Sequence, residues 1–402
     1  MADLPNEPDT PKGPAGVDAA GHVRFPSIEK FRNMLEQVPR VFKGSPPPIL
    51  TFHGTVKLHG THADLRLLPS GAVVVQSRNR VLTVDADNDG CARFFAERAH
   101  AVRDLLARAA ALVEAEMPLR PCGSDADADA DADGYSSSDE APGHPEGATD
   151  EAQGHPDEGV MIAGEFCGRG VQSKVAICRL PLMFVALAVR RGTRGPWIDL
   201  GTSGTSGGLC TGLEAQGFQC IADFPTYALR VDLSSPEAAL EEAQRLTLEI
   251  DRECPVALRL SGGAVRGPGE GIVWTCVERP HSTRLWFKTK GPTHTAPGPP
   301  KQPPVSSIPG GRTAVAALAA SVVPEWRLEQ GVAYLHEMGL ASGGTEVTVK
   351  DIPAFVRWVT DDAFREERDT IGDSGMPPTE VRRAISILAC SYLKQYQGNN
   401  KG

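Results

Sequence analysis

The sequence predicts an α+β domain of strands with flanking helices, followed by a small all-α domain. Up to about residue 292, runs rich in β-branched and aromatic residues alternate with segments of helical apolar spacing. A Pro-rich stretch comes next, and beyond it only the helical spacing remains. The chain has 402 residues, which is long enough for two or three domains with a sizeable buried core.

In the first half of the α+β domain, the sequence marks where the expected elements begin and end. Residues 1–24 are rich in Pro, Ala, Gly and acidic residues, so we expect a disordered tail. A short helix is expected over 28–42, and three prolines then lead into a strand over 49–58. The run 65–81 predicts a hairpin because turn residues separate two β-rich halves. Helical spacing over 90–116 predicts a helix on the flank of a sheet.

An acidic insert is expected over 123–159. The stretch 124–159 holds twelve Asp or Glu residues and no Lys or Arg, and much of it alternates Asp with Ala. Such a sequence has no apolar face to bury and repels itself, so it predicts a disordered loop. The net charge of −10 comes from this segment, since 41 basic residues face 39 acidic ones elsewhere. The overall acidity therefore excludes no nucleic-acid partner.

The second half of the α+β domain resumes with strands and one helix. The expected strands cover 161–171, 180–189, 269–275 and 283–291, and the expected helix covers 235–253. A Pro-rich linker is expected over 293–312 and an α-helical domain over 313–398. The helical domain is predicted from nine apolar positions, Leu328, Val332, Leu335, Ile352, Phe355, Val359, Ile385, Leu388 and Tyr392.

Cysteine usage and the lack of targeting signals indicate a cytoplasmic or nuclear protein. The nine cysteines are an odd number with no C-x-x-C pair, which argues against a disulfide framework and a structural zinc site. No run of about 18 apolar residues appears, so no membrane span is expected. The N-terminus resembles neither a secretion signal nor an organelle transit peptide.

Four short clusters place charged residues in strand or glycine-turn contexts. Lys57 ends a β-rich run in KLHG, where a partly desolvated lysine can act as a nucleophile. Glu165 enters a glycine turn in GEFCGRG, and Glu270 lies in GEGIVW. Lys288 and Lys290 share one face of a strand in FKTK, because side chains alternate there. Each cluster by itself is also typical of an ordinary surface, and their order along the chain is more specific.

The order of these motifs resembles that of the covalent nucleotidyltransferases. Lys-x-His-Gly, Gly-Glu-Phe, Phe184, Glu-Gly-Ile-Val and Lys-Thr-Lys follow one another between residues 50 and 291. The superfamily contains ATP-dependent RNA and DNA ligases and GTP-using mRNA capping enzymes, and the histidine in KLHG is most similar to the RNA ligase 2 family. The resemblance implies that residues 25–292 form an adenylyltransferase domain with ATP-grasp-like antiparallel sheets.

The resemblance also implies catalytic roles. Lys57 would attack the α-phosphate of ATP, and a lysine must first lose its proton to do so. Lys288, Lys290 and a bound divalent metal would supply positive charge near the amine and offset charge on the α-phosphate. Glu270 would hold the metal, which is expected to be Mg²⁺ or Mn²⁺.

Nucleotide-binding roles follow from the same resemblance. Glu165 would bind the ribose 2′-hydroxyl and Phe184 would stack on adenine. Val56 has no polar side chain, so base choice would rest on backbone groups, and His59 would shape the motif turn. Lys288 and Lys290 would also contact the nucleotide.

Two further positions concern the sugar and the nucleic acid. Arg78 occupies the place of a basic residue of the family, and Arg80 is the competing assignment. His62 stands where the family usually has asparagine, or arginine in its DNA-joining members. A histidine can still donate to a ribose or phosphate, but its charge varies near neutral pH.

These roles imply an ATP-dependent RNA ligase that acts in RNA repair. Lys57 would form lysyl-AMP, AMP would pass to an RNA 5′-phosphate, and a 3′-hydroxyl would displace it to join the ends. The expected partner is a nicked duplex or broken RNA ends, which the C-terminal helices would engage, and the expected state is a monomer. The alternatives are a GTP-dependent guanylyltransferase of the mRNA-capping type and a non-catalytic RNA-binding protein that retains the fold.

Overall fold

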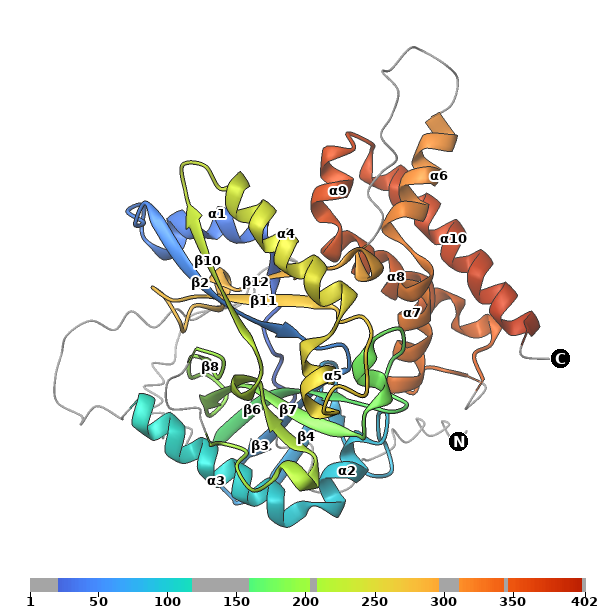
Figure 1. The fold of residues 1–402 in the computed structure, drawn as a ribbon. Helices are drawn as coiled ribbons and strands as arrows, with labels where there is room; N and C mark the ends of the chain where they lie inside the picture. The colour runs from blue at the N-terminus through green and yellow to red at the C-terminus, as the bar shows by residue number, and fades with distance from the viewer. Residues whose placement is uncertain (1–20, 118–158, 203–207, 296–310, 343–345, 400–402) are drawn as a thin grey trace, which may run out of the picture. The chain divides into compact units, whose positions relative to one another are not determined.

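Two compact units make up the protein, with the division after Thr289 (Figure 1). The computed structural model describes residues 21–117, 159–202, 208–295, 311–342 and 346–399. The expected tail up to residue 20, the acidic insert up to residue 158 and most of the expected linker lie outside these ranges. The described part is a mixed α/β unit with largely antiparallel sheets followed by a helical unit, as the sequence predicted.

The first sheet of the α/β unit has five strands. Their spatial order is β1 (Glu29–Lys30), β12 (Phe287–Lys290), β11 (Gly271–Cys276), β2 (Ile49–Lys57) and β10 (Thr226–Asp232). β2 pairs antiparallel with both β10 and β11, although β11 lies some two hundred residues further along the chain. The helices of this part are α1 (Phe31–Val41), α4 (Glu237–Arg252), which packs on β10 and β11, and α5 (Pro255–Leu260).

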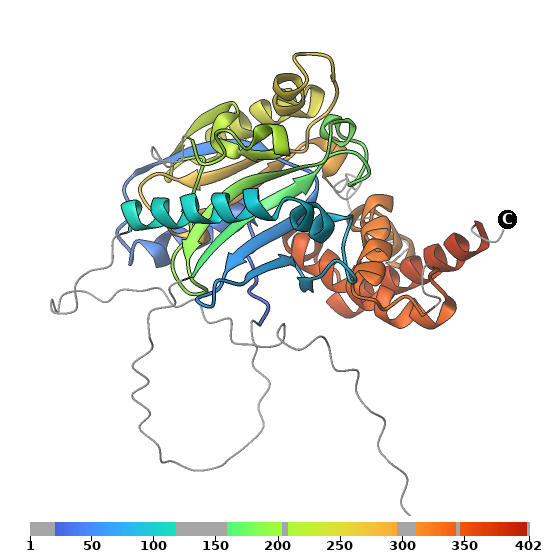
Figure 2. The ribbon, with the colours of Figure 1, turned by 90° about the horizontal axis from the view of Figure 1, so that it is seen from below.

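The second sheet has seven strands. Six follow the order β5 (Val81–Leu82), β4 (Val73–Ser77), β3 (Thr61–Leu67), β6 (Val160–Cys167), β7 (Met183–Arg191) and β8 (Ile198–Asp199), while β9 (Phe218–Cys220) pairs with β7. β3 and β4 form the predicted hairpin, with Leu67 opposite Val73. α2 (Cys91–Glu97) and α3 (Ala99–Glu116) lie along one face of this sheet (Figure 2).

The helix predicted over 90–116 is broken at Arg98. The backbone of Arg98 leaves the helical region at φ −117° and ψ 29°, so α2 ends and α3 begins there. The guanidinium of Arg98 donates to the carbonyl oxygens of Phe94 and Gln216 at 3.1 and 2.9 Å. The break lets α2 and α3 follow the twisted sheet in two straight pieces.

Residues 21–28, here named the N-terminal segment, lie against the second sheet. Arg66 Nη1 donates to the Gly21 carbonyl at 2.6 Å, and Val23 N donates to Gln76 Oε1 at 3.2 Å. Residues 21–24, expected to belong to the disordered tail, are therefore bound to β3 and β4. The apolar side chains of the segment, Val23, Phe25 and Ile28, pack on a small buried cluster of Met161, Ala163, Ala188, Trp197 and Trp286.

The second unit is helical, as predicted. Its helices are α6 (Gly311–Val322), α7 (Glu325–Glu337), α8 (Ile352–Glu366), α9 (Arg368–Asp373) and α10 (Pro378–Asn399). Most of the apolar positions that predicted it are buried in one core, namely Leu328, Val332, Leu335, Phe355, Val359 and Ile385. Arg327 lies inside this unit with 1% of its side chain exposed, and it contacts Asp362 at 3.0 Å and Glu367 at 3.3 Å.

Membrane-spanning helices and disulfides can be assessed only in the described residues. Within the described ranges, no helix has the length and hydropathy needed to cross a bilayer. The eight cysteines that fall in those ranges are free thiols.

Candidate active site around Lys57

Lys57 stands at the end of β2, where the chain leaves the first sheet. Its Nζ donates to Glu270 Oε2 at 2.7 Å, and His59 Nδ1 lies 3.3 Å from the same oxygen. Glu270 directly precedes β11, and the register of that strand places Gly271 opposite Lys57. The sheet therefore joins two of the predicted motifs, and the Glu270 side chain, only 2% exposed, faces a cation in a low-dielectric setting.

Glu165 joins this cluster through the turn that follows β2. Its Oε1 accepts a hydrogen bond from the backbone N–H of Gly60 at 2.7 Å. Burial raises the pKa of Glu165 above its ordinary value, against the opposing effects of Lys57, His62 and the Gly60 N–H. Lys57 and Glu165 are thus close enough to influence each other, and three predicted motifs meet at this turn.

His62 is the Cα partner of Glu165 across the pairing of β3 with β6. Its Nε2 lies 2.9 Å from Asp64 Oδ1, and its ring lies 5.0 Å from the ring of Phe25. The pKa of His62 is raised because Asp64 and Glu165 outweigh the lowering effects of burial and of Arg78. Asp64 and Phe25 were not among the predicted site residues.

The structure distinguishes Arg78 from Arg80. Arg80 binds the loop after β5, where its guanidinium donates to the carbonyl oxygens of Ala86 and Asp87 at 2.8 and 2.9 Å. Arg78 is exposed, and its charge acts on His62. Arg78 is therefore the better placed of the two for a ligand of this site.

Lys288 lies on the face of the first sheet that also carries Lys57. Thr289 contacts Thr247 of α4 at 2.6 Å, so Thr289 faces that helix and Lys288 faces the other way. On β11, Trp274 binds Thr289 at 3.1 Å and faces α4, which puts Gly271 and its partner Lys57 on the opposite face. Lys290 ends β12 and is the first residue of the second unit.

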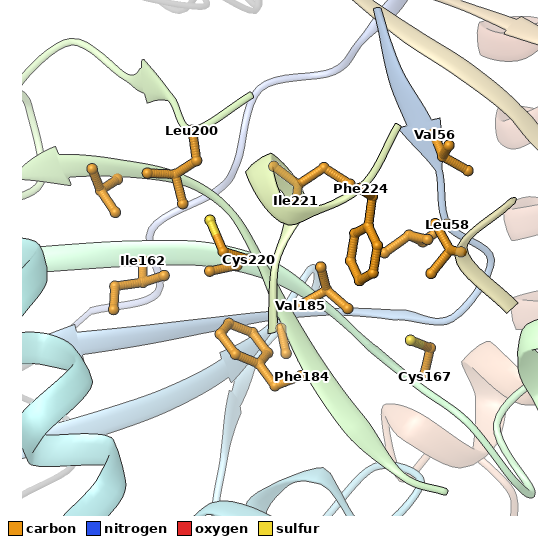
Figure 3. Packing of buried hydrophobic residues seen from close by; sticks show 14 of the residues in the cluster. Val56, Leu58, Ile162, Cys167, Phe184, Val185, Leu200, Cys220, Ile221 and Phe224 are labelled. Atoms are coloured by element: carbon orange, nitrogen blue, oxygen red, sulfur yellow. The ribbon is translucent and has the colours of Figure 1, made fainter. Parts of the chain in front are cut away.

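Phe184 and Val56 are packed in the core. The Phe184 ring is 0% exposed and lies edge-to-face with Phe95 at 5.2 Å between centroids. In the pairing of β6 with β7, Phe184 lies opposite Phe166, whereas Glu165 lies opposite Val185. Figure 3 shows Phe184 among buried side chains. In this arrangement the Phe184 ring packs inside the hydrophobic core. Val56 is 2% exposed, in keeping with a side chain that reads no base.

The residues present fit a divalent metal bound mainly by phosphate groups. Glu270 supplies a hard carboxylate oxygen beside Lys57, and Mg²⁺ in nucleotide sites often takes one or two carboxylates plus phosphate oxygens. Among the residues that the structure describes, no group of three or more His, Cys, Asp or Glu side chains forms a metal cluster. Glu270 is the side chain that would hold such a metal.

Sequence comparisons find no match, and structural comparison finds only weak similarities. No known family model and no curated protein matches the chain. Solved structures of a Naegleria gruberi RNA ligase resemble it. One with AMP and manganese gives TM-score 0.37 at 14% identity, covering 68% of this chain and 59% of that chain. One with pyrophosphate gives TM-score 0.35 at 15% identity, covering 70% and 62%.

The chain thus spans about three fifths of the length of these neighbours. A similarity this distant assigns no family. The function proposed below rests on the motif order and on the geometry around Lys57.

Proposed function

We propose that this protein is an ATP-dependent RNA ligase that works through a lysyl-AMP intermediate. The observation that carries the proposal is the ion pair of Lys57 with the buried Glu270 at 2.7 Å, beside the Glu165 that binds Gly60. Sequence reasoning predicted these residues from motifs that are far apart in the chain. Their meeting at one turn is what a shared site requires and what unrelated surface charges would not produce.

Lys57 is the proposed nucleophile. Its amine would form a P–N bond to the α-phosphorus of ATP while the bond to pyrophosphate breaks, and the proton of the amine must leave before attack. The contact with Glu270 holds the amine at a fixed place at the end of β2, which is the positioning that an in-line displacement needs. A bound Mg²⁺ or Mn²⁺ would supply positive charge to the phosphates.

The other residues of the cluster would bind and orient the nucleotide. Glu165 would accept from a ribose hydroxyl, since its Oε1 already accepts from Gly60 and a carboxylate has further lone pairs. Lys288 and Lys290 would offset charge on the α-phosphate, and the exposed Arg78 would contact the sugar or the RNA. Adenine stacking is not proposed for Phe184, because its ring is in the core.

The remaining steps would transfer AMP to RNA and join the ends. The 5′-phosphate of an RNA end would attack lysyl-AMP and release Lys57, and a 3′-hydroxyl would then displace AMP to form the phosphodiester. The helical unit would engage RNA in these later steps, which do not require it to touch ATP.

The test uses labelled nucleotides and a nicked RNA duplex. The wild-type protein is expected to retain label from ATP but not from GTP after denaturation, and to seal the nick. Lys57→Ala should abolish both activities, because it removes the amine that would carry AMP. Lys394→Ala, on the exposed side of α10, is the matched control for lysyl-AMP formation and should keep it. A wild-type protein that takes up label from GTP alone would support a guanylyltransferase instead.

A further inference from the structure

β3 places His62 and Asp64 next to each other on one face of the second sheet. Residues two apart in a strand share a face, and here His62 Nε2 and Asp64 Oδ1 lie 2.9 Å apart. Asp64 is fully buried, while His62 keeps 16% of its side chain exposed. Neither atom makes a hydrogen bond of normal geometry in the described chain, their mutual contact included. The contact between His62 and Asp64 is therefore an ion pair at short distance rather than a well-directed hydrogen bond.

A second layer of contacts holds Asp64 in place. Gln76, its Cα partner on β4, donates from Nε2 to Asp64 Oδ2 at 2.8 Å. The Gln76 amide also binds both backbone groups of Val23 in the N-terminal segment. With Gln76 fixed from both sides, the Asp64 carboxylate stays turned toward His62. A carboxylate buried in this way is costly unless a donor or a positive charge compensates it.

The surroundings of His62 favour its charged form. Asp64 on the same strand and Glu165 on β6 attract a proton to the ring, whereas burial and Arg78 oppose it, and together they raise the pKa of His62. From the N-terminal segment, Phe25 contributes an apolar ring at 5.0 Å. His22 of that segment is engaged with the Ser77 carbonyl at 3.0 Å, and Arg24 is exposed.

We propose that Asp64 is a positioning residue that holds His62 as an imidazolium, so that its second ring nitrogen donates to a phosphate of the nucleotide or of the RNA end. Nε2 is engaged with Asp64, which leaves Nδ1 as the nitrogen for a ligand. The partly exposed ring lies across from Glu165, beside the Lys57 turn where phosphates would be bound. A charged donor at this place binds a phosphate more strongly than a neutral one.

This inference rests on the proposed ligase function, but one readout is independent of it. The ring nitrogens of ¹⁵N-labelled histidine report the titration of His62 in the full chain, with the signal assigned through His62→Asn. Asp64→Asn should move the His62 midpoint to lower pH, because the charge that favours protonation is gone while burial remains. The control is Asp199→Asn, which makes the same change at a buried aspartate that influences His53 instead. An unchanged midpoint in Asp64→Asn overturns the proposal.

The second readout separates the two sources of phosphate. Lysyl-AMP formation reports on ATP, and joining of pre-adenylylated RNA reports on the RNA end without using Lys57 as nucleophile. In whichever of these two assays His62 contacts the phosphate, the wild-type rate should fall as the pH rises through the titration of His62. In Asp64→Asn the rate should fall at a lower pH than in the wild type, and at pH 8 it should be about tenfold below the wild-type rate.

His62→Asn, which keeps a neutral donor, should be slower and lack this pH dependence. If neither wild-type rate follows the His62 titration, His62 does not act as a charged donor and the proposal is wrong. If no lysyl-AMP forms at all, the ligase function fails, while the ring titration still decides whether Asp64 holds the proton on His62. Should Asp64→Asn not fold, the comparison of wild type with His62→Asn decides the charged-donor role.

Discussion

Gly60 is where the turn after β2 meets β6, and the space there admits no side chain. A Cβ on Gly60 would lie 2.3 Å from the carbonyl oxygen of Phe166 and 2.8 Å from Cys167 Cβ. Any larger residue must push the turn away from β6 and with it the N–H that binds Glu165. The glycine of KLHG thus has a steric reason beyond the flexibility of a turn.

Gly60→Ala should therefore lower the rate of lysyl-AMP formation more than it lowers the stability of the fold. Displacing the turn by a fraction of an ångström separates Lys57 from Glu165, and a misplacement of this kind can lower the rate by about 10²-fold. Single-turnover lysyl-AMP formation measures the effect. Gly372→Ala is the control, because a Cβ there meets nothing within 4 Å. Equal rates for Gly60→Ala and wild type would show that the turn does not position Glu165.

Asp199 is a second residue whose burial has a measurable consequence. Burial raises its pKa above the ordinary value, against hydrogen bonds from Thr275 at 2.9 Å and Gly201 at 3.3 Å. The folded state thus binds the proton more tightly than the unfolded state. Its contribution to stability is present below the unfolded pKa and is lost as pH rises through the folded pKa.

Asp199→Asn should accordingly raise the melting temperature more at pH 8 than at pH 4. Asparagine keeps an acceptor for Thr275 and carries no charge to bury. Thermal unfolding at the two pH values measures the difference. A larger gain at pH 4 than at pH 8 would contradict the sign of the pKa shift.

At the scale of elements, many of the strands and most helices could be predicted from the sequence, but β10 and the pairing partners of the strands could not. The β-branched runs predicted β2, β6, β7 and β11 because strand composition is a local property. The pairing of β2 with β11 joins residues far apart in the chain, and only tertiary packing decides it. Lys57 and Glu270 were therefore predicted as motif members, while their contact required the structure.

The position of Phe184 shows the same limit within one pair of strands. Phe184 and Val185 are neighbours in sequence, yet Val185 is the one that lies opposite Glu165. A shift of one residue in register moves a side chain to the other face of a sheet, and the β6–β7 pairing has a bulge at Ala163 and Gly164. Composition alone could not say which of the two residues shares the face of Glu165.

The N-terminal segment is an element that the sequence did not reveal. Its residues have little local propensity, and their stability comes from contacts with strand residues 45 and 53 positions later in the chain. Phe25 is its main anchor, with ring contacts to His62 at 5.0 Å and to Trp197 at 4.9 Å. The segment therefore covers the face of the second sheet that carries His62.

Phe25→Ala should lower the free energy of unfolding by about 2–3 kcal/mol, because a large and partly buried ring is lost. Chemical denaturation measures this free energy of unfolding. Ile387→Ala is the control, since that side chain is 60% exposed and should change the free energy little. A loss no larger than that of Ile387→Ala would mean that the segment is not anchored to the sheet.

At the scale of the whole molecule, the division after Thr289 separates the Lys57 cluster from the helical core. Each unit has its own buried cluster, and the cluster of the helical unit surrounds Arg327 with its partners Asp362 and Glu367. The linker and the helical spacing predicted a separate helical domain from residue 313, whereas the compact units divide after Thr289. The buried arginine could not be predicted, because its sequence position on α7 looks like an ordinary exposed turn of helix.

Arg327→Ala should destabilise the helical unit by about 3–5 kcal/mol, because it removes the buried cation that contacts both Asp362 and Glu367. Lysyl-AMP formation should continue in this variant while RNA joining is lost, if the two units divide the work as proposed. Calorimetry and the two activity assays measure this. Loss of lysyl-AMP in parallel with joining would show that the helical unit is needed for reaction with ATP.

Lys57 is the residue that should carry AMP. After incubation with ATP and Mg²⁺, proteolysis and mass spectrometry of the peptides should find AMP on Lys57. The adduct should disappear when pyrophosphate is added, because the first step is reversible. Adenylylation at another residue, or a peptide containing Lys57 that never carries AMP, would contradict the account.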